Sequence, residues 1–241
     1  METKITFFKL SLIALFLFIS SSTFSATYYV CSNGTVNLTP DAPGTSITYT
    51  WDVKNSVGVS IATYPKAITP TAGVYAITMP AATTADTYTI LLISTSSDNS
   101  ICAPDVATNT VIVLPPLTVG LTTPNNPVYC TTATSHSSFV TATPSALPSG
   151  GTIATDLETE FSYTLTKDGA TVTPVDYGTI VGNVYTLNTT TAGVYIITAT
   201  IKYKQKAPTN VLLSSTGGCP TTATQTITVT ATPAAPSITV S

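Results

Sequence analysis

Few side chains in this sequence could do chemistry: one histidine, four cysteines and eleven acidic residues in 241 positions. Enzymes usually need a histidine, a carboxylate pair or a positioned metal. His136 lies in a polar stretch, residues 134–138, just ahead of a β-prone segment, and no nucleophile motif accompanies it. We therefore expect an exposed loop histidine rather than a Ser-His-Asp arrangement, and we predict no catalytic residue and no cofactor.

Acidic residues recur at alternate positions in one place, at Asp156, Glu158 and Glu160. Clustered carboxylates can hold calcium, because hard cations prefer oxygen ligands. A solvent-facing edge is the plain alternative, and a charge ladder is a third. Whether calcium binds here stays open at the level of the sequence.

The ladder follows from a second alternating run, in which Lys202, Lys204 and Lys206 share the same spacing. Alternate residues of a strand share one face. If Leu165 and Tyr195 point into a core, the two runs point outward and lie side by side on antiparallel strands. The residues of the predicted ladder are Glu158, Glu160, Lys202 and Lys204.

The four cysteines are read as disulfide-forming rather than metal-binding, because no Cys-x-x-Cys occurs and only one histidine is available. They are Cys31, Cys102, Cys130 and Cys219, an even number, and four cysteines allow three pairings.

The first 25 residues have the layout of a secretory signal peptide. Lys4 and Lys9 make the start positive, and an apolar run extends from residue 10 to residue 19, broken only by Ser11. Ten residues are too few to span a membrane, which takes about 20. We expect cleavage after Ser25, with Ala26 as the alternative, and no membrane insertion of the mature chain. A buried N-terminal helix is the competing interpretation.

Charge is scarce in the mature part, which keeps six of the eight lysines and ten of the eleven acids and has no arginine. Phosphate recognition needs clustered basic residues, so nucleic acid is excluded as a partner. An anionic membrane surface is disfavoured for the same reason. A neutral surface rich in Thr and Ser fits a secreted or cell-surface location.

An internal repeat sets the architecture. Each copy runs from an early Cys through short Thr/Val/Tyr-rich segments to a second Cys and a closing segment. The first copy has residues 28–31, 36–40, 47–51, 74–77, 86–90, Cys102 and 111–114. The second has residues 128–130, 140–144, 161–165, 184–187, 192–197, Cys219 and 227–229. Thr-Ala-Gly-Val-Tyr occurs at residues 71–75 and 191–195, but pairing these two breaks the order of the later segments, so Tyr88 is matched to Tyr195.

Seven short strands per copy predict an all-β protein of two tandem immunoglobulin-like antiparallel β-sandwiches. Tyr88 and Tyr195 match the tyrosine corner of such sandwiches, and Trp51 and Leu165 are expected to fill the cores. The predicted organisation is a signal peptide (1–25), module 1 (26–115), module 2 (116–232), and a linker that begins a further module (233–241).

The repeat favours one disulfide inside each module, Cys31–Cys102 and Cys130–Cys219. Each bond would tie the start of its module to the loop before the last strand. Closing loops of this size contributes roughly 4 kcal/mol by constraining the unfolded chain.

This pattern resembles the immunoglobulin-like and PKD-like modules repeated in large secreted adhesins of gliding-type Gram-negative bacteria. Cys31, Val36, residues 49–51, Tyr88, Cys102 and residues 111–113 carry the likeness in module 1; Cys130, Val140, Tyr163, residues 193–195 and residues 218–219 carry it in module 2. Leu165 stands where Trp is usual, and Tyr88 lacks the preceding Gly. The resemblance implies surface display or adhesion and supplies no ligand.

The leading hypothesis is thus an exported, non-catalytic module pair that acts as an adhesive or spacer segment. Its partners would be an unidentified surface glycan or protein and further modules of the same polypeptide, because residues 233–241 resemble the linker at 114–119. The alternative is a carbohydrate-binding accessory module of an exported enzyme. Its sugar-stacking candidates are Tyr28, Tyr29, Tyr64, Tyr129, Tyr177 and Tyr203.

Overall fold

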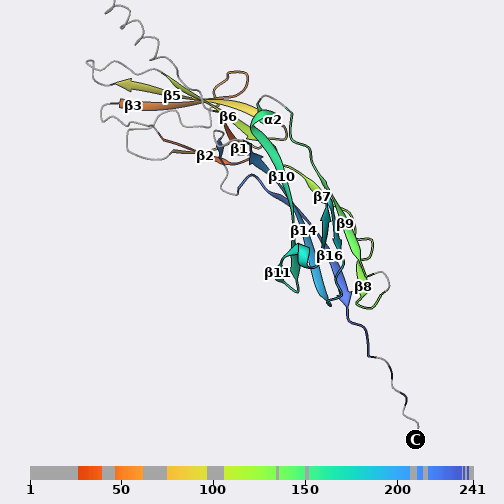
Figure 1. The fold of residues 1–241 in the computed structure, drawn as a ribbon. Helices are drawn as coiled ribbons and strands as arrows, with labels where there is room; N and C mark the ends of the chain where they lie inside the picture. The colour runs from red at the N-terminus through yellow and green to blue at the C-terminus, as the bar shows by residue number, and fades with distance from the viewer. Residues whose placement is uncertain are drawn as a thin grey trace, which may run out of the picture. The chain divides into compact units, whose positions relative to one another are not determined.

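The computed structural model describes residues 27–39, 47–61, 75–96, 106–133, 136–149, 152–206, 211–213 and 217–234, with Pro236 and Ile238. The predicted signal peptide, Tyr64 and Cys102 lie outside these ranges. Apart from the short helices α2 (Ile153–Asp156) and η1 (Pro174–Asp176), the described elements are β-strands (Figure 1). No helix in these ranges is long and apolar enough to cross a membrane.

The chain divides into two compact units. The first contains Met1–Tyr28, Val36–Ile77 and Asp86–Ile112; the second contains Tyr29–Thr35, Thr78–Ala85 and Val113–Ser241. The predicted module 1, residues 26–115, would contain Tyr29–Thr35 and Thr78–Ala85. In the structure these two segments belong to the second unit.

Strand β3 (Ile47–Lys54) pairs antiparallel with β5 (Asp86–Ser96), with Trp51 opposite Leu92. Alternation along β3 buries Tyr49, Trp51 and Val53. These strands belong to a sheet ordered β15-β1-β6-β5-β3, and β2 pairs with β4 in a second sheet. The remaining bounds are β1 (Thr27–Cys31), β2 (Thr35–Leu38), β4 (Tyr75–Thr78), β6 (Ala107–Leu114) and β15 (Val211–Leu213).

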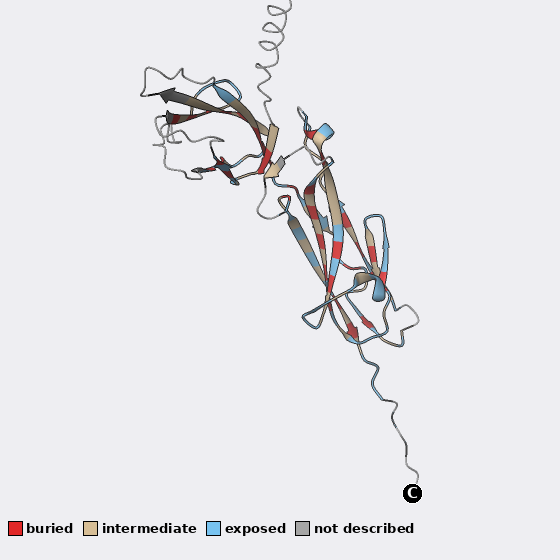
Figure 2. Ribbon diagram, turned by 60° about the vertical axis from the view of Figure 1, so that its left-hand side comes forward, coloured by how far each residue is buried: buried red, intermediate tan, exposed pale blue. Residues whose placement is uncertain are grey.

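The second unit holds two further sheets, ordered β11-β10-β14-β16-β8 and β12-β13-β9-β7. The first contains β8 (Val128–Cys130), β10 (Leu157–Lys167), β11 (Ala170–Val172), β14 (Gly193–Gln205) and β16 (Thr221–Thr230). The second contains β7 (Val119–Leu121), β9 (Ser138–Pro144), β12 (Gly178–Val181) and β13 (Val184–Leu187). Buried and accessible residues alternate along these strands, as period-2 side chains require (Figure 2).

The inner faces of these two sheets form one core that includes Val140, Tyr185, Leu187, Ile197 and Ile227. The four residues predicted to fill the cores are all buried: Trp51, Tyr88, Leu165 and Tyr195. The Tyr195 hydroxyl donates a 2.8 Å hydrogen bond to the Thr191 carbonyl, four residues upstream, which is the geometry of a tyrosine corner.

Strand order shows the repeat at the level of topology. The order β3-β5-β6-β1 recurs as β10-β14-β16-β8, and the pair β2-β4 recurs as β9-β13. This correspondence matches β4 to β13 and β5 to β14, so Tyr88 and Tyr195 occupy equivalent strands. The all-β fold class with immunoglobulin-like sandwiches is confirmed.

Candidate functional site

The disulfide is not where the repeat predicted it. Cys31 at the end of β1 is bonded to Cys219 in the loop before β16, with 5.7 Å between the Cα atoms, and both residues lie in the second unit. The pairings Cys31–Cys102 and Cys130–Cys219 are therefore wrong, because a sulfur atom forms one disulfide only. Cys130 carries a free, exposed thiol. The physical reason is that the end of β1 meets the loop before β16, the closing strand of the second repeat.

Backbone contacts hold each cysteine in place. On one side, the Ser32 amide donates to the Leu114 carbonyl at 2.9 Å. On the other, the Tyr203 amide donates to the Gly218 carbonyl at 2.7 Å. Gly218 has a φ of 106°, and a Cβ there would lie 2.0 Å from the Tyr203 carbonyl oxygen, so only glycine fits before Cys219.

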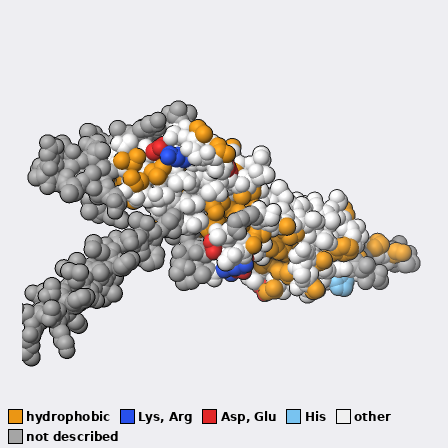
Figure 3. Space-filling model, turned by 90° about the horizontal axis from the view of Figure 1, so that it is seen from above, with side chains coloured by type: hydrophobic (Ala, Val, Ile, Leu, Met, Phe, Trp, Pro, Cys, Tyr) orange, Lys and Arg blue, Asp and Glu red, His pale blue; other side chains and the backbone are white. Residues whose placement is uncertain are grey.

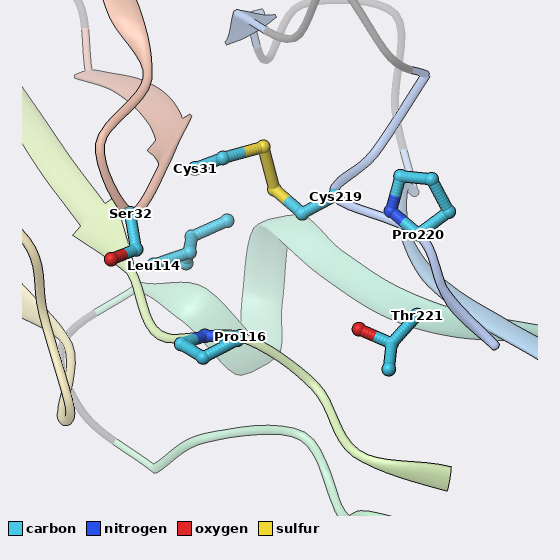
Figure 4. Close-up of a pocket in the computed structure, with 7 residues that line it drawn as sticks. All are labelled: Cys31, Ser32, Leu114, Pro116, Cys219, Pro220 and Thr221. Carbon is cyan, nitrogen blue, oxygen red and sulfur yellow. A yellow bond between two sulfur atoms is a disulfide. The ribbon is translucent and has the colours of Figure 1, made fainter. Parts of the chain in front are cut away.

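A depression of about 260 Å³ lies beside the disulfide (Figure 4). Its lining is Cys31, Ser32, Leu114, Pro116, Cys219, Pro220 and Thr221. None of these residues is charged, and the two sulfur atoms are bonded to each other. The lining therefore offers neither a general acid–base pair nor a thiolate nucleophile, and its chemistry is that of a cross-link.

Two buried tyrosines pack the same region of the second unit. The Tyr29 hydroxyl donates to Asp156 Oδ2 at 2.5 Å and lies 2.7 Å from Thr152 Oγ1. Burial, together with the bond to Asp156, raises the pKa of Tyr29 to about 12. The Tyr203 hydroxyl donates to the Pro115 carbonyl at 2.8 Å, and burial raises the pKa of Tyr203. Both hydroxyls serve as structural hydrogen-bond donors.

These positions bear on the predicted sugar-stacking tyrosines. Tyr29, Tyr129 and Tyr203 are buried, while Tyr28 and Tyr177 are half-buried. The ring of Tyr177 packs on Tyr195, with centroids 5.6 Å apart. The described candidates thus provide no flat exposed aromatic platform of the kind that stacks on a sugar ring.

The two alternating charged runs lie opposite one another on β10 and β14. Glu158 is in register with Lys204, and Glu160 with Lys202. The Lys204 Nζ–Glu158 Oε1 and Lys202 Nζ–Glu160 Oε2 distances are 3.5 Å and 3.6 Å. This is the arrangement that the alternate spacing predicts.

The end members of the runs behave differently. Asp156 accepts the Tyr29 hydroxyl, and Lys206 Nζ donates to the Ala154 carbonyl at 2.5 Å. With Glu158 and Glu160 held by lysines, the acids of this run are already partnered. Within the described ranges, no group of three or more His, Cys, Asp or Glu side chains is placed to hold a metal ion.

His136 is exposed, and its Nδ1 lies 3.2 Å from the Ala133 carbonyl oxygen. Its contact is thus to the backbone of its own loop. This is the position expected from the polar stretch around it.

The outer face of β10, β14 and β16 carries ranks of hydroxyl groups that were not singled out in the sequence. In register across the three strands are Thr164, Thr198 and Thr224, with Ser162, Thr200 and Thr222 in the next rank. Thr226 and Thr228 continue the series on β16. The alternating Thr residues of 222–228 are the signal that could have revealed it. On the face seen in Figure 3, the charged side chains of the described residues form small patches among uncharged ones.

No protein-family model and no curated protein matches the sequence. Among solved structures, the chain is similar to fibronectin(III)-like modules of Clostridium thermocellum CbhA, with 16% identity, 87% of this chain and 93% of that chain covered, and a TM-score of 0.38. It is also similar to the FN1–FN3 domains of chicken CNTN1, with 14% identity, 85% and 64% covered, and a TM-score of 0.41. The BSP domain of a biofilm-associated protein is 14% identical, with 85% of this chain and 29% of that chain covered and a TM-score of 0.26. At these values the likeness concerns the β-domain fold alone.

Proposed function

We propose that this chain is an exported, non-catalytic pair of immunoglobulin-like modules that serves as a spacer or adhesive segment of a multi-module cell-surface protein. Residues 26–115 and 116–232 are the proposed modules, and further modules of the same polypeptide are the proposed neighbours. The observation that carries the proposal is the Cys31–Cys219 disulfide, a cross-link within the second unit whose surroundings hold no charged side chain.

The segment that follows β6 is ordered within the second unit. Here Leu114, Pro115 and Leu117 are buried within the second unit, and the Pro115 carbonyl is bonded by Tyr203. The Thr118 carbonyl accepts a 2.7 Å bond from the Ser145 amide, while the Ser145 hydroxyl accepts from the Thr118 amide at 3.0 Å. These contacts fix the segment within the second unit, as suits a structural role.

Export is supported by the disulfide, because such bonds persist in oxidising compartments and are rare in the cytosol. The predicted signal peptide at residues 1–25 agrees with this. The adhesive part of the proposal rests on the hydroxyl ranks of β10, β14 and β16, which offer donors and acceptors to a glycan or a protein without a fixed charge.

Expression of the full chain in a Gram-negative host tests the proposal. We expect removal of residues 1–25, location outside the cytoplasm, and a Cys31–Cys219 bond. A matched variant, Leu15→Arg, interrupts the apolar run and should stay in the cytoplasm with both thiols free. Wild-type chain retained inside the cell, uncleaved and reduced, would refute export and with it the proposed function.

A glycan array separates an adhesive segment from a plain spacer. Specific binding that is lost in Thr164→Glu/Thr224→Glu, but kept in a control with Thr179→Glu on β12, would assign adhesion to the hydroxyl face. If the wild type binds no glycan on the array, the adhesive role is refuted and only the spacer role remains.

A further inference from the structure

Cys130 is the counterpart of Cys31 in the repeat. Each closes a short strand, β8 and β1, that stands beside the last strand of its copy in the shared sheet order. Cys31 is bonded, whereas Cys130 is exposed and free. The two cysteines thus occupy equivalent places in the repeat, and one of them has a partner that the other lacks.

The partner of Cys31 belongs to the second repeat. Cys219 precedes β16, the closing strand of the second copy, 188 residues further along the chain. The bonding rule shown by this disulfide is that an opening-strand cysteine joins the closing-loop cysteine of the next copy. Applied to Cys130, the same rule points to the closing-loop cysteine of a module beyond this one.

An independent feature repeats at the same place. The residue after Cys31 donates its amide to the last residue of β6, Ser32 to Leu114 at 2.9 Å. The residue after Cys130 does the same with the last residue of β16, Thr131 to Thr230 at 3.0 Å. In both copies the chain thus leaves its module directly beside the opening-strand cysteine.

The start of the segment that leaves the second module is fixed by hydroxyl contacts. Thr232 Oγ1 lies 3.0 Å from Thr131 Oγ1 and 2.8 Å from Thr132 Oγ1, so the departing chain is held against the loop that begins after Cys130.

We propose that Cys130 forms a disulfide with the Gly-Cys loop of a subsequent module of the same kind, so that successive modules are joined by staggered disulfides. This inference rests on the multi-module part of the proposed function. The two thiols lose two protons and two electrons to form the new S–S bond. An external disulfide such as oxidised glutathione accepts them and is released as two thiols.

A tandem protein tests this. Residues 1–240 are followed by a second copy of residues 120–232, which aligns Val240 with Val119 and keeps the chain's own linker. After oxidation with glutathione disulfide, peptide mass spectrometry without reduction should show two bonds, Cys31 to the first Cys219 and Cys130 to the appended Cys219. In a tandem whose first Cys130 is replaced by Ser, the Cys219 of the appended copy should be free and should react with maleimide.

Linker length is controlled by a second tandem that lacks residues 231–235, which places Ile238 as far from Thr230 as Leu117 is from Leu114. The proposal is overturned if Cys130 stays alkylatable in both tandems while Cys31–Cys219 has formed. It is equally overturned if Cys130 in the original full chain is bonded to Cys102. Either result leaves export and the spacer role intact, so the two proposals fail separately.

Discussion

At the scale of single residues, buried tyrosines contribute through the hydroxyl group at the edge of an apolar ring. Tyr129, Tyr163, Tyr185 and Tyr195 each donate to a backbone carbonyl, at distances from 2.7 to 3.0 Å. Desolvation is the first cause that raises the pKa of each, since the charged phenolate is disfavoured in the core. A ring that fills the core thus fixes a loop at the same time.

Tyr195→Phe tests this at the corner. The ring stays buried, but the Thr191 carbonyl loses its donor, and we expect a loss of about 1 kcal/mol in the free energy of unfolding. Urea denaturation measures it. Tyr177→Phe, which keeps the ring contact to Tyr195, is the control and should be neutral. Equal stability of the two variants would contradict the role given to the hydroxyl.

Asp168 stabilises the turn between β10 and β11 and links it to β14. It sits at a φ of 50° in the two-residue turn between β10 and β11, beside Gly169 at 84°, as a tight hairpin requires. Its carboxylate accepts from Lys167 Nζ and from the Val194 amide, both at 2.8 Å. The Lys167 bond and then the Val194 amide lower the pKa of Asp168 from its ordinary value of 3.8.

A lowered pKa in the folded state means that Asp168 stabilises the fold above pH 3.8, the ordinary value. The contribution is lost as the pH falls through the still lower pKa of the folded protein. We expect Asp168→Asn to flatten the acid limb of stability against pH, measured by urea titration between pH 2 and 7. An acid limb that keeps its slope in Asp168→Asn would contradict this role of the carboxylate.

At the scale of elements, the register of β10 against β14 sets the outer surface. One pairing places Glu158 and Glu160 opposite lysines and brings serine and threonine hydroxyls into ranks. A slip of one residue would turn the ladder and the ranks inward and the buried tyrosines outward. Exposed ion pairs contribute little free energy each, so the buried face, rather than the ion pairs, fixes the register.

A double-mutant cycle on Glu160→Gln and Lys202→Gln measures the pair. We expect a coupling energy of about 0.5 kcal/mol at low salt, vanishing in concentrated salt. A cycle on Glu160→Gln and Lys54→Gln is the reference, because Lys54 pairs with Asp52 instead. Coupling that persists unchanged in concentrated salt would show that the interaction is not electrostatic.

At the scale of the whole molecule, one cross-link closes most of the chain. A disulfide lowers the entropy of the unfolded state more as its loop lengthens, although strain often reduces the effect. The Cys31–Cys219 loop spans 188 residues. The amide of Ser32, the residue after Cys31, also donates to the Leu114 carbonyl at the end of β6.

Cys31→Ala/Cys219→Ala should therefore lower the free energy of unfolding by up to about 5 kcal/mol, and reduction of the wild type should do the same. Calorimetry with and without reductant measures both. Cys130→Ser is the matched control and should not change the unfolding midpoint, because that thiol is free and exposed. If reductant leaves the unfolding of the wild type unchanged, the stabilising role of the Cys31–Cys219 disulfide is contradicted.

The features that the sequence determined by itself are periodic and local. Alternation along strands and the order of landmarks sufficed to predict the fold class, the equivalence of Tyr88 and Tyr195, and the facing of Glu160 and Lys202, because period-2 side chains and antiparallel neighbours result from short-range geometry.

The features that only the tertiary structure decided depend on where distant ends meet. The bond between Cys31 and Cys219 needs two Cα atoms 5.7 Å apart across 188 residues, and nothing local favours it over the pairing within one repeat. The hydroxyl groups of the buried Tyr29 and Tyr203 likewise find their acceptors far along the chain, at the Asp156 carboxylate and the Pro115 carbonyl. Spacing in a sequence says which face a side chain takes, but packing decides what that face meets.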